Sequence, residues 1–316
     1  MPRTVRLQII VFAFLVTISF LWISRVSRPE IMVRNTTPST RVVGSLAPYR
    51  HVTKSLSELG KMDEVSAHIL MLNAVPKSGS EILVLLIQWL QGWNNFRHVR
   101  LKGSKRKLSN LEQEEFVDDF YKTVRDEAVP LCFDRNMYFI NFTRFDKQSP
   151  TYINLIRDPA DYLISRFNHL MGKKVSSFDA IEDCILKRRS KCDLHSGMHY
   201  DLAIPYFCGQ DPRCALLNDD WALDQAKSNV ERYYSVVGIL EEVNATLQVF
   251  EKDVPFFFKG VQRLYYRDLL QPFHRNRKMI KASDKFRKYA KLILAKEYEF
   301  YEWSKRRLFR QLVQSN

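Results

Sequence analysis

The sequence has no Gly-x-x-x-x-Gly-Lys-Ser/Thr loop, no internal repeat and only 5 cysteines among its 316 residues. The missing loop argues against a nucleoside triphosphatase. The cysteine spacing fits local disulfides better than a metal site, so we expect no bound metal. A second long apolar run is also missing, which places everything after the N-terminal run on one side of any membrane that this run spans.

Acidic residues are few relative to basic ones. The chain carries 35 Asp and Glu against 49 Lys and Arg, which leaves a net charge of +14. Such an excess indicates a polyanionic partner, which can be nucleic acid, anionic lipid or an acidic polysaccharide. A hydrophobic content of 46% with 13% aromatic residues is ample for a packed core. The composition therefore predicts a globular protein with one large domain or two small ones.

The first apolar run extends from Leu7 to Ile23, carries no charge and is flanked by arginines. At about 1.5 Å per residue it just spans a thin bilayer such as those of the early secretory pathway. A cleaved signal peptide is the alternative, but no small-x-small site follows the run. We expect an uncleaved signal-anchor. The expected divisions are a cytoplasmic tail at 1–6, a transmembrane anchor at 7–24, a Pro/Ser/Thr-rich stem at 25–64 and a luminal domain at 65–316.

Cysteine spacing and glycosylation sequons suggest the same luminal side. Cys184 with Cys192 and Cys208 with Cys214 close two short loops, which leaves Cys132 unpaired. Five reduced core cysteines would be the reading without the anchor. Asn-x-Thr sequons, which predict glycosylation, stand at Asn35, Asn141 and Asn244.

The central stretch of the chain predicts a strand, a tight loop and a helix. Residues 68–73 form an apolar run, 75–80 read Val-Pro-Lys-Ser-Gly-Ser, and 81–93 carry apolar residues at helical spacing. Backbone N–H groups at a helix N-terminus attract negative charge, and Lys77 adds a positive charge beside them. We expect an anion site there, with an ordinary surface turn as the alternative.

Later strands continue the alternation. Apolar runs at 137–142, 151–156 and 235–239 predict strands, with helical patterns after the last two. The fold class is therefore α/β, a single three-layer domain around a central parallel sheet. Arg157 ends one strand and Ser165 lies two turns into the next helix, so both can face a ligand at the strand ends or serve structure alone. Residues 101–111 are basic and predict either a solvated loop or a polyanion contact.

Several blocks together resemble a known family. These are the loop at 75–80, Tyr-Ile-Asn-Leu-Ile-Arg-Asp-Pro at 152–159, Pro-Tyr-Phe-Cys-Gly at 205–209, Trp-Ala-Leu-Asp-Gln-Ala-Lys at 221–227 and Val-Val-Gly-Ile-Leu-Glu-Glu at 236–242. Their order is that of the uronyl and heparan sulfate 2-O-sulfotransferases, most of all the uronyl branch with the insect Pipe proteins. The resemblance covers roughly residues 66 to 305.

This resemblance implies a single-pass type II protein of the Golgi membrane. Its activity would be transfer of a sulfuryl group from 3′-phosphoadenosine 5′-phosphosulfate (PAPS) to the 2-hydroxyl of a uronic acid in a heparan or dermatan/chondroitin sulfate type glycosaminoglycan. It implies no nucleic-acid partner, no metal, and a homo-oligomer such as a trimer. The donor-binding residues implied are Lys77, Ser78, Gly79 and Ser80 at the loop, with Arg157 and Ser165 at the 3′-phosphate; Lys77 is also catalytic.

The sequence departs from the family where the general base is expected. The family's His-x-His matches Asn136 and Tyr138, neither of which titrates near neutrality without a large shift. A displaced base would be Tyr138, His169 or another histidine. Ala74 and Glu81 also differ from the family's loop. The alternative function is a catalytically impaired sulfotransferase-fold protein that acts as a polyanion-binding or partner module.

Overall fold

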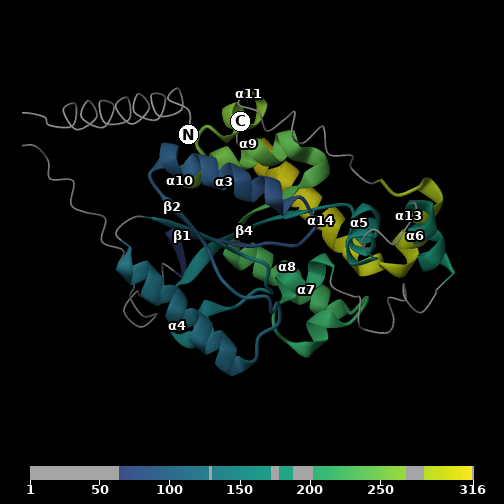
Figure 1. Ribbon diagram of the computed structural model, residues 1–316, viewed down its shortest axis with the longest axis horizontal. Helices are drawn as coiled ribbons and strands as arrows, with labels where there is room; N and C mark the ends of the chain where they lie inside the picture. Colours follow the sequence, from purple (N-terminus) through teal and green to yellow (C-terminus); the bar gives the residue numbers. More distant parts are fainter. Residues whose placement is uncertain (1–63, 128–129, 172–177, 188–201, 268–280, 315–316) are drawn as a thin grey trace, which may run out of the picture. The chain divides into compact units, whose positions relative to one another are not determined.

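The computed structural model describes residues 64–127, 130–171, 178–187, 202–267 and 281–314. Within them, parallel strands form one five-stranded sheet in the order β2-β3-β1-β4-β5 (Figure 1). The strands are β1 (Val65–Asn73), β2 (Arg97–Arg100), β3 (Leu131–Arg135), β4 (Ser149–Ile156) and β5 (Tyr234–Ile239).

Helices cover both faces of this sheet and make it the middle of three layers (Figure 1). One face is covered by α3 (Ser80–Asn94), α9 (Val243–Asp253), α10 (Pro255–Phe258) and α11 (Val261–Arg267). The other is covered by α4 (Asn110–Asp126), α7 (Ala203–Cys208) and α8 (Asp220–Tyr233). Helix α14 (Ala295–Val313) packs beside the edge strand β5, and α5 (Pro159–Met171), α6 (Phe178–Leu186) and α13 (Asp284–Ile293) lie together. The described residues thus form the expected α/β architecture.

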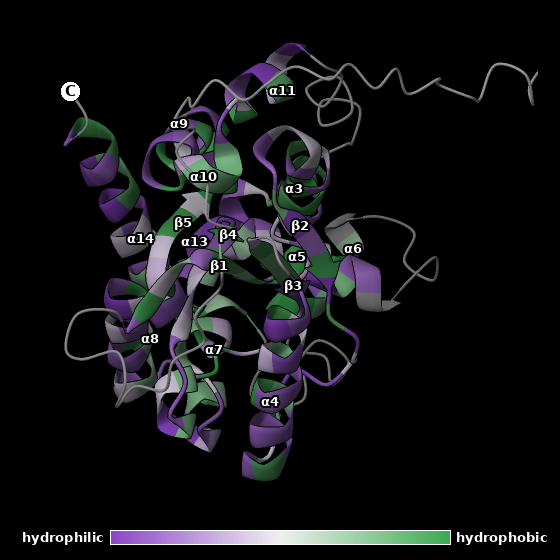
Figure 2. Cartoon of the chain, turned by 90° about the vertical axis from the view of Figure 1, so that its left-hand side faces the viewer, coloured by the Kyte–Doolittle hydropathy of each residue, from purple (hydrophilic) through white to green (hydrophobic). Residues whose placement is uncertain are grey.

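Amphipathic patterning explains how the helices attach, and Figure 2 shows green and purple residues on different sides of single helices. In α3, Ile82, Leu86 and Leu90 are buried against the sheet while Trp89 and Trp93 remain exposed. Helix α5 starts where Asp158 caps it, because its Oδ1 accepts hydrogen bonds from two N–H groups of the first turn. Side-chain periodicity therefore orients each helix toward the sheet.

One prediction about the elements is wrong. The strand expected at 137–142 is absent, and the strand of that region is β3, which precedes it. The N–H of Phe139 donates to the carbonyl of Tyr206 in α7 instead of to a neighbouring strand, so the segment is apolar because it is buried. At the C-terminal end of the described residues, α13 and α14 are separate helices, since the backbone leaves helical geometry at Leu294 (φ −118°, ψ 40°).

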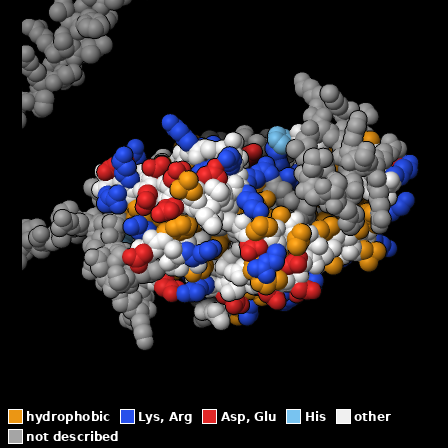
Figure 3. All heavy atoms as spheres, turned by 90° about the horizontal axis from the view of Figure 1, so that it is seen from below, with side chains coloured by type: hydrophobic (Ala, Val, Ile, Leu, Met, Phe, Trp, Pro, Cys, Tyr) orange, Lys and Arg blue, Asp and Glu red, His pale blue; other side chains and the backbone are white. Residues whose placement is uncertain are grey.

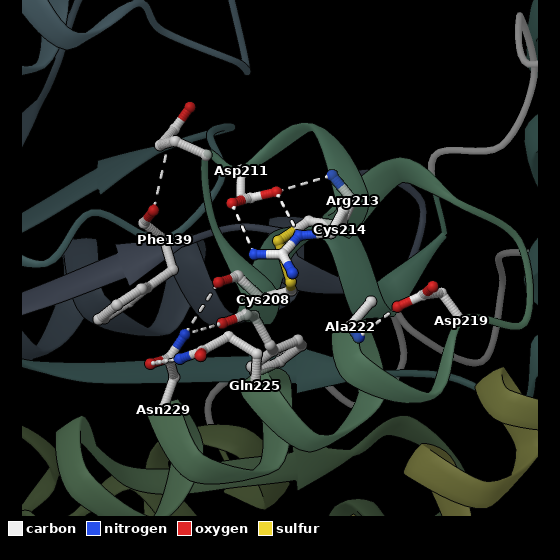
Figure 4. Close-up of a disulfide and its surroundings, with 11 residues drawn as sticks. Phe139, Cys208, Asp211, Arg213, Cys214, Asp219, Ala222, Gln225 and Asn229 are labelled. Atoms are coloured by element: carbon white, nitrogen blue, oxygen red, sulfur yellow. Dashed lines mark hydrogen bonds and ion pairs between the residues drawn. A yellow bond between two sulfur atoms is a disulfide. The ribbon is translucent and has the colours of Figure 1, made fainter.

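A disulfide joins Cys208 to Cys214, one of the two pairs expected from the sequence, with their Cα atoms 5.5 Å apart. Figure 4 shows the compact turn that it closes between α7 and α8. Asn229 of α8 donates to two carbonyl oxygens at the end of α7, which fixes this turn against the sheet-facing helix. Cys184 is also disulfide-bonded, and its expected partner Cys192 lies outside the described residues. Burial raises the pKa of the free Cys132 thiol.

None of the helices in the described ranges is long and apolar enough to cross a membrane. The predicted tail, anchor and stem, and the sequon at Asn35, lie outside those ranges except for residue 64.

A buried amide at the carboxyl end of β1 joins this strand to β4, β5 and α7. Asn73, at the end of β1, is fully buried. Its Nδ2 donates to the carbonyl of Tyr206 at 2.9 Å, and its Oδ1 accepts from the Tyr234 hydroxyl at 3.0 Å. Asn154 of β4 donates to the Asn73 carbonyl at 2.8 Å. Because the loop of the predicted anion site follows Asn73 immediately, this amide fixes the point at which that loop starts.

We expect Asn73→Leu to destabilise the fold far more than Tyr234→Phe. The tyrosine change removes one hydrogen bond and should lower the free energy of unfolding by about 1 kcal/mol. The asparagine change leaves several buried groups without partners, each costing about 1 to 3 kcal/mol. Urea denaturation of the two variants and wild type measures the difference, and equal losses would show that Asn73 does not organise the strand ends.

Candidate active site

The loop between β1 and α3 has two residues with positive φ, Lys77 at 64° and Gly79 at 93°. The hydroxyls of Ser78 and Ser80 both donate to the carbonyl of Val75, at 2.7 and 2.9 Å, which folds the loop back on itself. Gly79 is the N-cap of α3 and offers no side-chain hydrogen bond to it. The N–H of Ile82 donates to the Gly79 carbonyl at 2.9 Å, and no side chain caps the helix, so the dipole of α3 can attract an anion at its N-terminus.

Only glycine fits position 79. A Cβ there would lie 2.7 Å from Cδ1 of Leu240 and 3.3 Å from Cδ2 of Leu155. The positive φ adds backbone strain for any other residue. The loop shape thus depends on a close approach of its backbone to the sheet and to the segment after β5.

A cavity of about 500 Å³ opens beside this loop, at the carboxyl ends of β2 and β3 and along α5. Five basic and two acidic side chains line it, so the cavity is cationic, whereas Figure 3 shows Lys and Arg interspersed with Asp and Glu over one face of the molecule. The charged lining residues are Lys77, Arg100, Arg106, Arg135 and Arg166 with Glu81 and Asp134; Asn136 and His169 also line it.

Arg157 lies at the same edge of the sheet but not in the same cavity. It directly follows β4, the parallel neighbour of β1, and its side chain is 6% exposed with Nη2 4.0 Å from Oδ2 of Asp161. It lines a separate space of about 10 Å³ together with Ser78 and Glu297. Ser165 is half-buried on α5 and lines neither space. The structure brings Lys77 and Arg157 to neighbouring strand ends, while the loop itself separates their surroundings.

The candidate bases have different positions. Tyr138 is buried, packs edge-to-face on Tyr206 with ring centroids 5.1 Å apart, and is not among the residues that line the cavity. Burial raises the pKa of the Tyr138 hydroxyl, against the smaller lowering effect of Arg106 and Arg166. It is therefore poorly suited to take up a proton near neutral pH. Asn136 and His169 are both exposed and line the cavity.

Several cavity residues were not singled out from the sequence. Arg106 belongs to the basic segment 101–111, but the sequence does not distinguish it from the other basic residues there as the one that lines the cavity with Lys77. Arg166 directly follows Ser165 and is buried beside the cavity. Asp134 was missed because it lies in β3, whereas the apolar pattern predicted the strand of this region at 137–142. Only the folded sheet brings these side chains to Lys77.

The other predicted modification and ligand residues are less informative. In the part of the chain that the structure describes, no group of three or more His, Cys, Asp or Glu could hold a metal ion. Asn141 is half-buried and its Oδ1 accepts from the Thr143 hydroxyl at 2.6 Å. Asn244 is exposed in the first turn of α9, whereas Thr246 of its sequon is buried. Glycosylation at these positions stays a prediction.

Comparison with known proteins gives consistent matches. Residues 65–304 match the model of the sulfotransferase family. Uronyl 2-sulfotransferase of Homo sapiens is 36% identical over 210 residues, 61% of this chain and 50% of that protein. The uronyl 2-sulfotransferase homolog pip of Drosophila melanogaster is 31% identical over 268 residues, which are 76% of this chain and 52% of that protein. Heparan sulfate 2-O-sulfotransferase 1 of Mus musculus is 29% identical over 229 residues, which are 68% of this chain and 63% of that protein. The match spans about half the length of the uronyl relatives.

We predict opposite effects for two glycine substitutions in one segment. Gly79→Ala should lower the free energy of unfolding by about 1 to 3 kcal/mol, because alanine is strained in the backbone conformation of the loop. Sulfate, used as a probe of the anion site, should then no longer raise the melting temperature. Gly92→Ala, within α3 and with nothing within 4 Å of the added Cβ, should raise stability by about 0.5 to 1 kcal/mol. Thermal unfolding with and without sulfate measures both. A sulfate-protected Gly79→Ala variant would contradict the anion site.

Proposed function

Because the chain belongs to the sulfotransferase family, we propose that it transfers a sulfuryl group from PAPS to the 2-hydroxyl of a uronic acid in a glycosaminoglycan. The observation that carries this proposal is the cationic cavity beside an uncapped helix N-terminus and Lys77. When bound, PAPS supplies the sulfuryl group, and negative charge grows on the oxygen that bridges sulfur to the leaving phosphate. Cations and N–H donors placed beforehand stabilise that charge.

The donor would be held at two places. Lys77 and the N-terminus of α3, which no side chain caps, fit the 5′-phosphosulfate, since the lysine and the helix dipole both favour negative charge there. Arg157 is assigned to the 3′-phosphate with Ser165. The space beside Arg157 is smaller than a phosphate, so we infer that the Arg157 side chain turns away from Asp161 when the donor binds.

The acceptor would occupy the cavity of about 500 Å³. Its excess of basic side chains suits a sugar that carries carboxylate and sulfate groups. Arg106 and Arg166 approach it from the basic segment and from α5, so the segment 101–111 contributes at least one polyanion contact under this proposal. The formal charge of +14 extends the same preference to a longer polyanion.

The cellular setting belongs to the same proposal. We propose a Golgi type II membrane protein with an uncleaved anchor, a stem, a luminal catalytic domain and a trimeric assembly. The Cys208–Cys214 disulfide supports an oxidising compartment, where such bonds persist.

A catalytically impaired module is the second candidate. Two observations favour it. Tyr138 is buried, and the residue that lines the cavity in this segment is Asn136, which cannot act as a general base. Such a protein would bind donor and polyanion without transferring sulfate.

Donor binding should depend on Arg157 and Lys77. Each charge-assisted hydrogen bond to a phosphate contributes about 1.5 to 3 kcal/mol, so either alanine variant should weaken the affinity for 3′-phosphoadenosine 5′-phosphate about tenfold or more. Titration calorimetry is the measurement. Arg97→Ala is the matched control, because Arg97 pairs with Glu127 and does not line the cavity. Undiminished binding by Arg157→Ala, or none by wild type, would exclude the donor site.

Sulfate transfer decides between the two functions. We expect the full chain to move radiolabelled sulfate from PAPS to desulfated heparan or dermatan sulfate, and disaccharide analysis should place the label on the 2-hydroxyl of the uronic acid. Binding of both ligands without incorporation would favour the impaired module, and label on another hydroxyl would refute the proposed regiochemistry.

A further inference from the structure

Asp134 is the buried carboxylate of the cationic cavity. It is the last but one residue of β3, is 4% exposed and lines the cavity together with Lys77. The other carboxylate in the lining belongs to Glu81, which is exposed at the start of α3. A buried acid at the edge of a ligand-sized cavity is a candidate for chemistry as well as for structure.

Two side chains of the edge strand β2 hold this carboxylate in place. Nε2 of His98 lies 2.6 Å from Oδ1 of Asp134, and both side chains are 5% exposed. Nε of Arg100 donates to Oδ2 at 3.1 Å. Arg100 is directly opposite Asp134 in the parallel pairing of β2 with β3. The two-residue period of a strand puts His98 on the same face, so the pairing itself orients the carboxylate.

The carboxylate keeps capacity for one more proton donor. An ionised carboxylate has about four lone-pair sites and only accepts, so Nε2 of His98 is the donor in their contact. Oδ1 accepts from His98 and, at 3.4 Å, from Arg100. Oδ2 accepts from Arg100 alone among the described residues. One lone pair of Oδ2 is therefore left on a side chain that lines the cavity.

We propose that Asp134 is the general base of this site and that His98 is its positioning residue, an inference that rests on the proposed function. Oδ2 of Asp134 takes the proton of the acceptor hydroxyl while that oxygen forms its bond to sulfur. The bond from sulfur to the bridging oxygen breaks, and 3′-phosphoadenosine 5′-phosphate leaves with the electron pair. The proton remains on Asp134 until product release, and the Nε2–H of His98 stays bonded to Oδ1.

A carboxylate is basic enough for this step. In a loose transition state the attacking hydroxyl becomes strongly acidic as its new bond forms, and aspartate performs the equivalent proton removal in the protein kinases. The basic side chains around the cavity keep Asp134 from repelling a polyanion, since five of them face two carboxylates. His169 borders the same cavity but is exposed, and Tyr138 is buried outside it.

The test measures kcat and KM for sulfate transfer by the full chain and its variants. Asp134→Asn should lower kcat about 10²- to 10⁴-fold, with donor KM and calorimetric affinity within about twofold of wild type. Added formate should raise the kcat of Asp134→Ala about tenfold or more, because it supplies the missing carboxylate. His98→Gln should lower kcat about 10- to 10²-fold, since the base is only displaced. A purely structural role would reduce the melting temperature without a response to formate.

Two controls make the outcome decisive. Glu127→Gln also removes an acid paired with an arginine of β2, but away from the cavity, and should retain wild-type kcat. His169→Gln tests the competing base. If Asp134→Asn unfolds, Asp134→Glu is compared instead, with kcat again reduced at unchanged donor affinity. Wild-type kcat in the Asp134 variant, or loss only in His169→Gln, overturns this inference alone. An inert wild type overturns it together with the proposed transfer activity.

Discussion

The buried amide of Asn73 is the interaction on which the site depends. It is fully buried, and its hydrogen bonds reach β4, β5 and α7 directly. Water cannot replace these partners, so the strand ends stay in one arrangement. The loop with Lys77 starts one residue later and inherits that position. The loop can keep its strained positive φ angles because the strand end from which it starts is held in place by Asn73.

Charge is distributed around that fixed loop in two different ways. On the side of β2 and β3, basic side chains surround an open cavity of about 500 Å³. On the side of α5 and α14, Arg157 lies among carboxylates in a space of about 10 Å³. Under the proposed function, the first arrangement would receive the polyanion as it stands. In the second, the Arg157 guanidinium lies 4.0 Å from Asp161, and a donor phosphate would have to take the place of that carboxylate.

The edge strand β2 connects the fold to the chemistry. It is short and carries His98 and Arg100 on one face, where they fix Asp134 at the rim of the cavity. An exposed edge strand is commonly blunted by charged residues. Here the same charges have a second use, since they orient the buried acid beside Lys77.

Local patterns were sufficient for the elements that carry their own signal. The strand, loop and helix around Lys77 and the strand that precedes Arg157 follow from periodicity within a few residues. The α/β class follows for the same reason. The position of β3, the burial of Tyr138 and the meeting of Asp134 with His98 depended on pairings between distant segments. Apolar periodicity records that a residue is buried but not which neighbour it meets, so these contacts exist only once the sheet has formed.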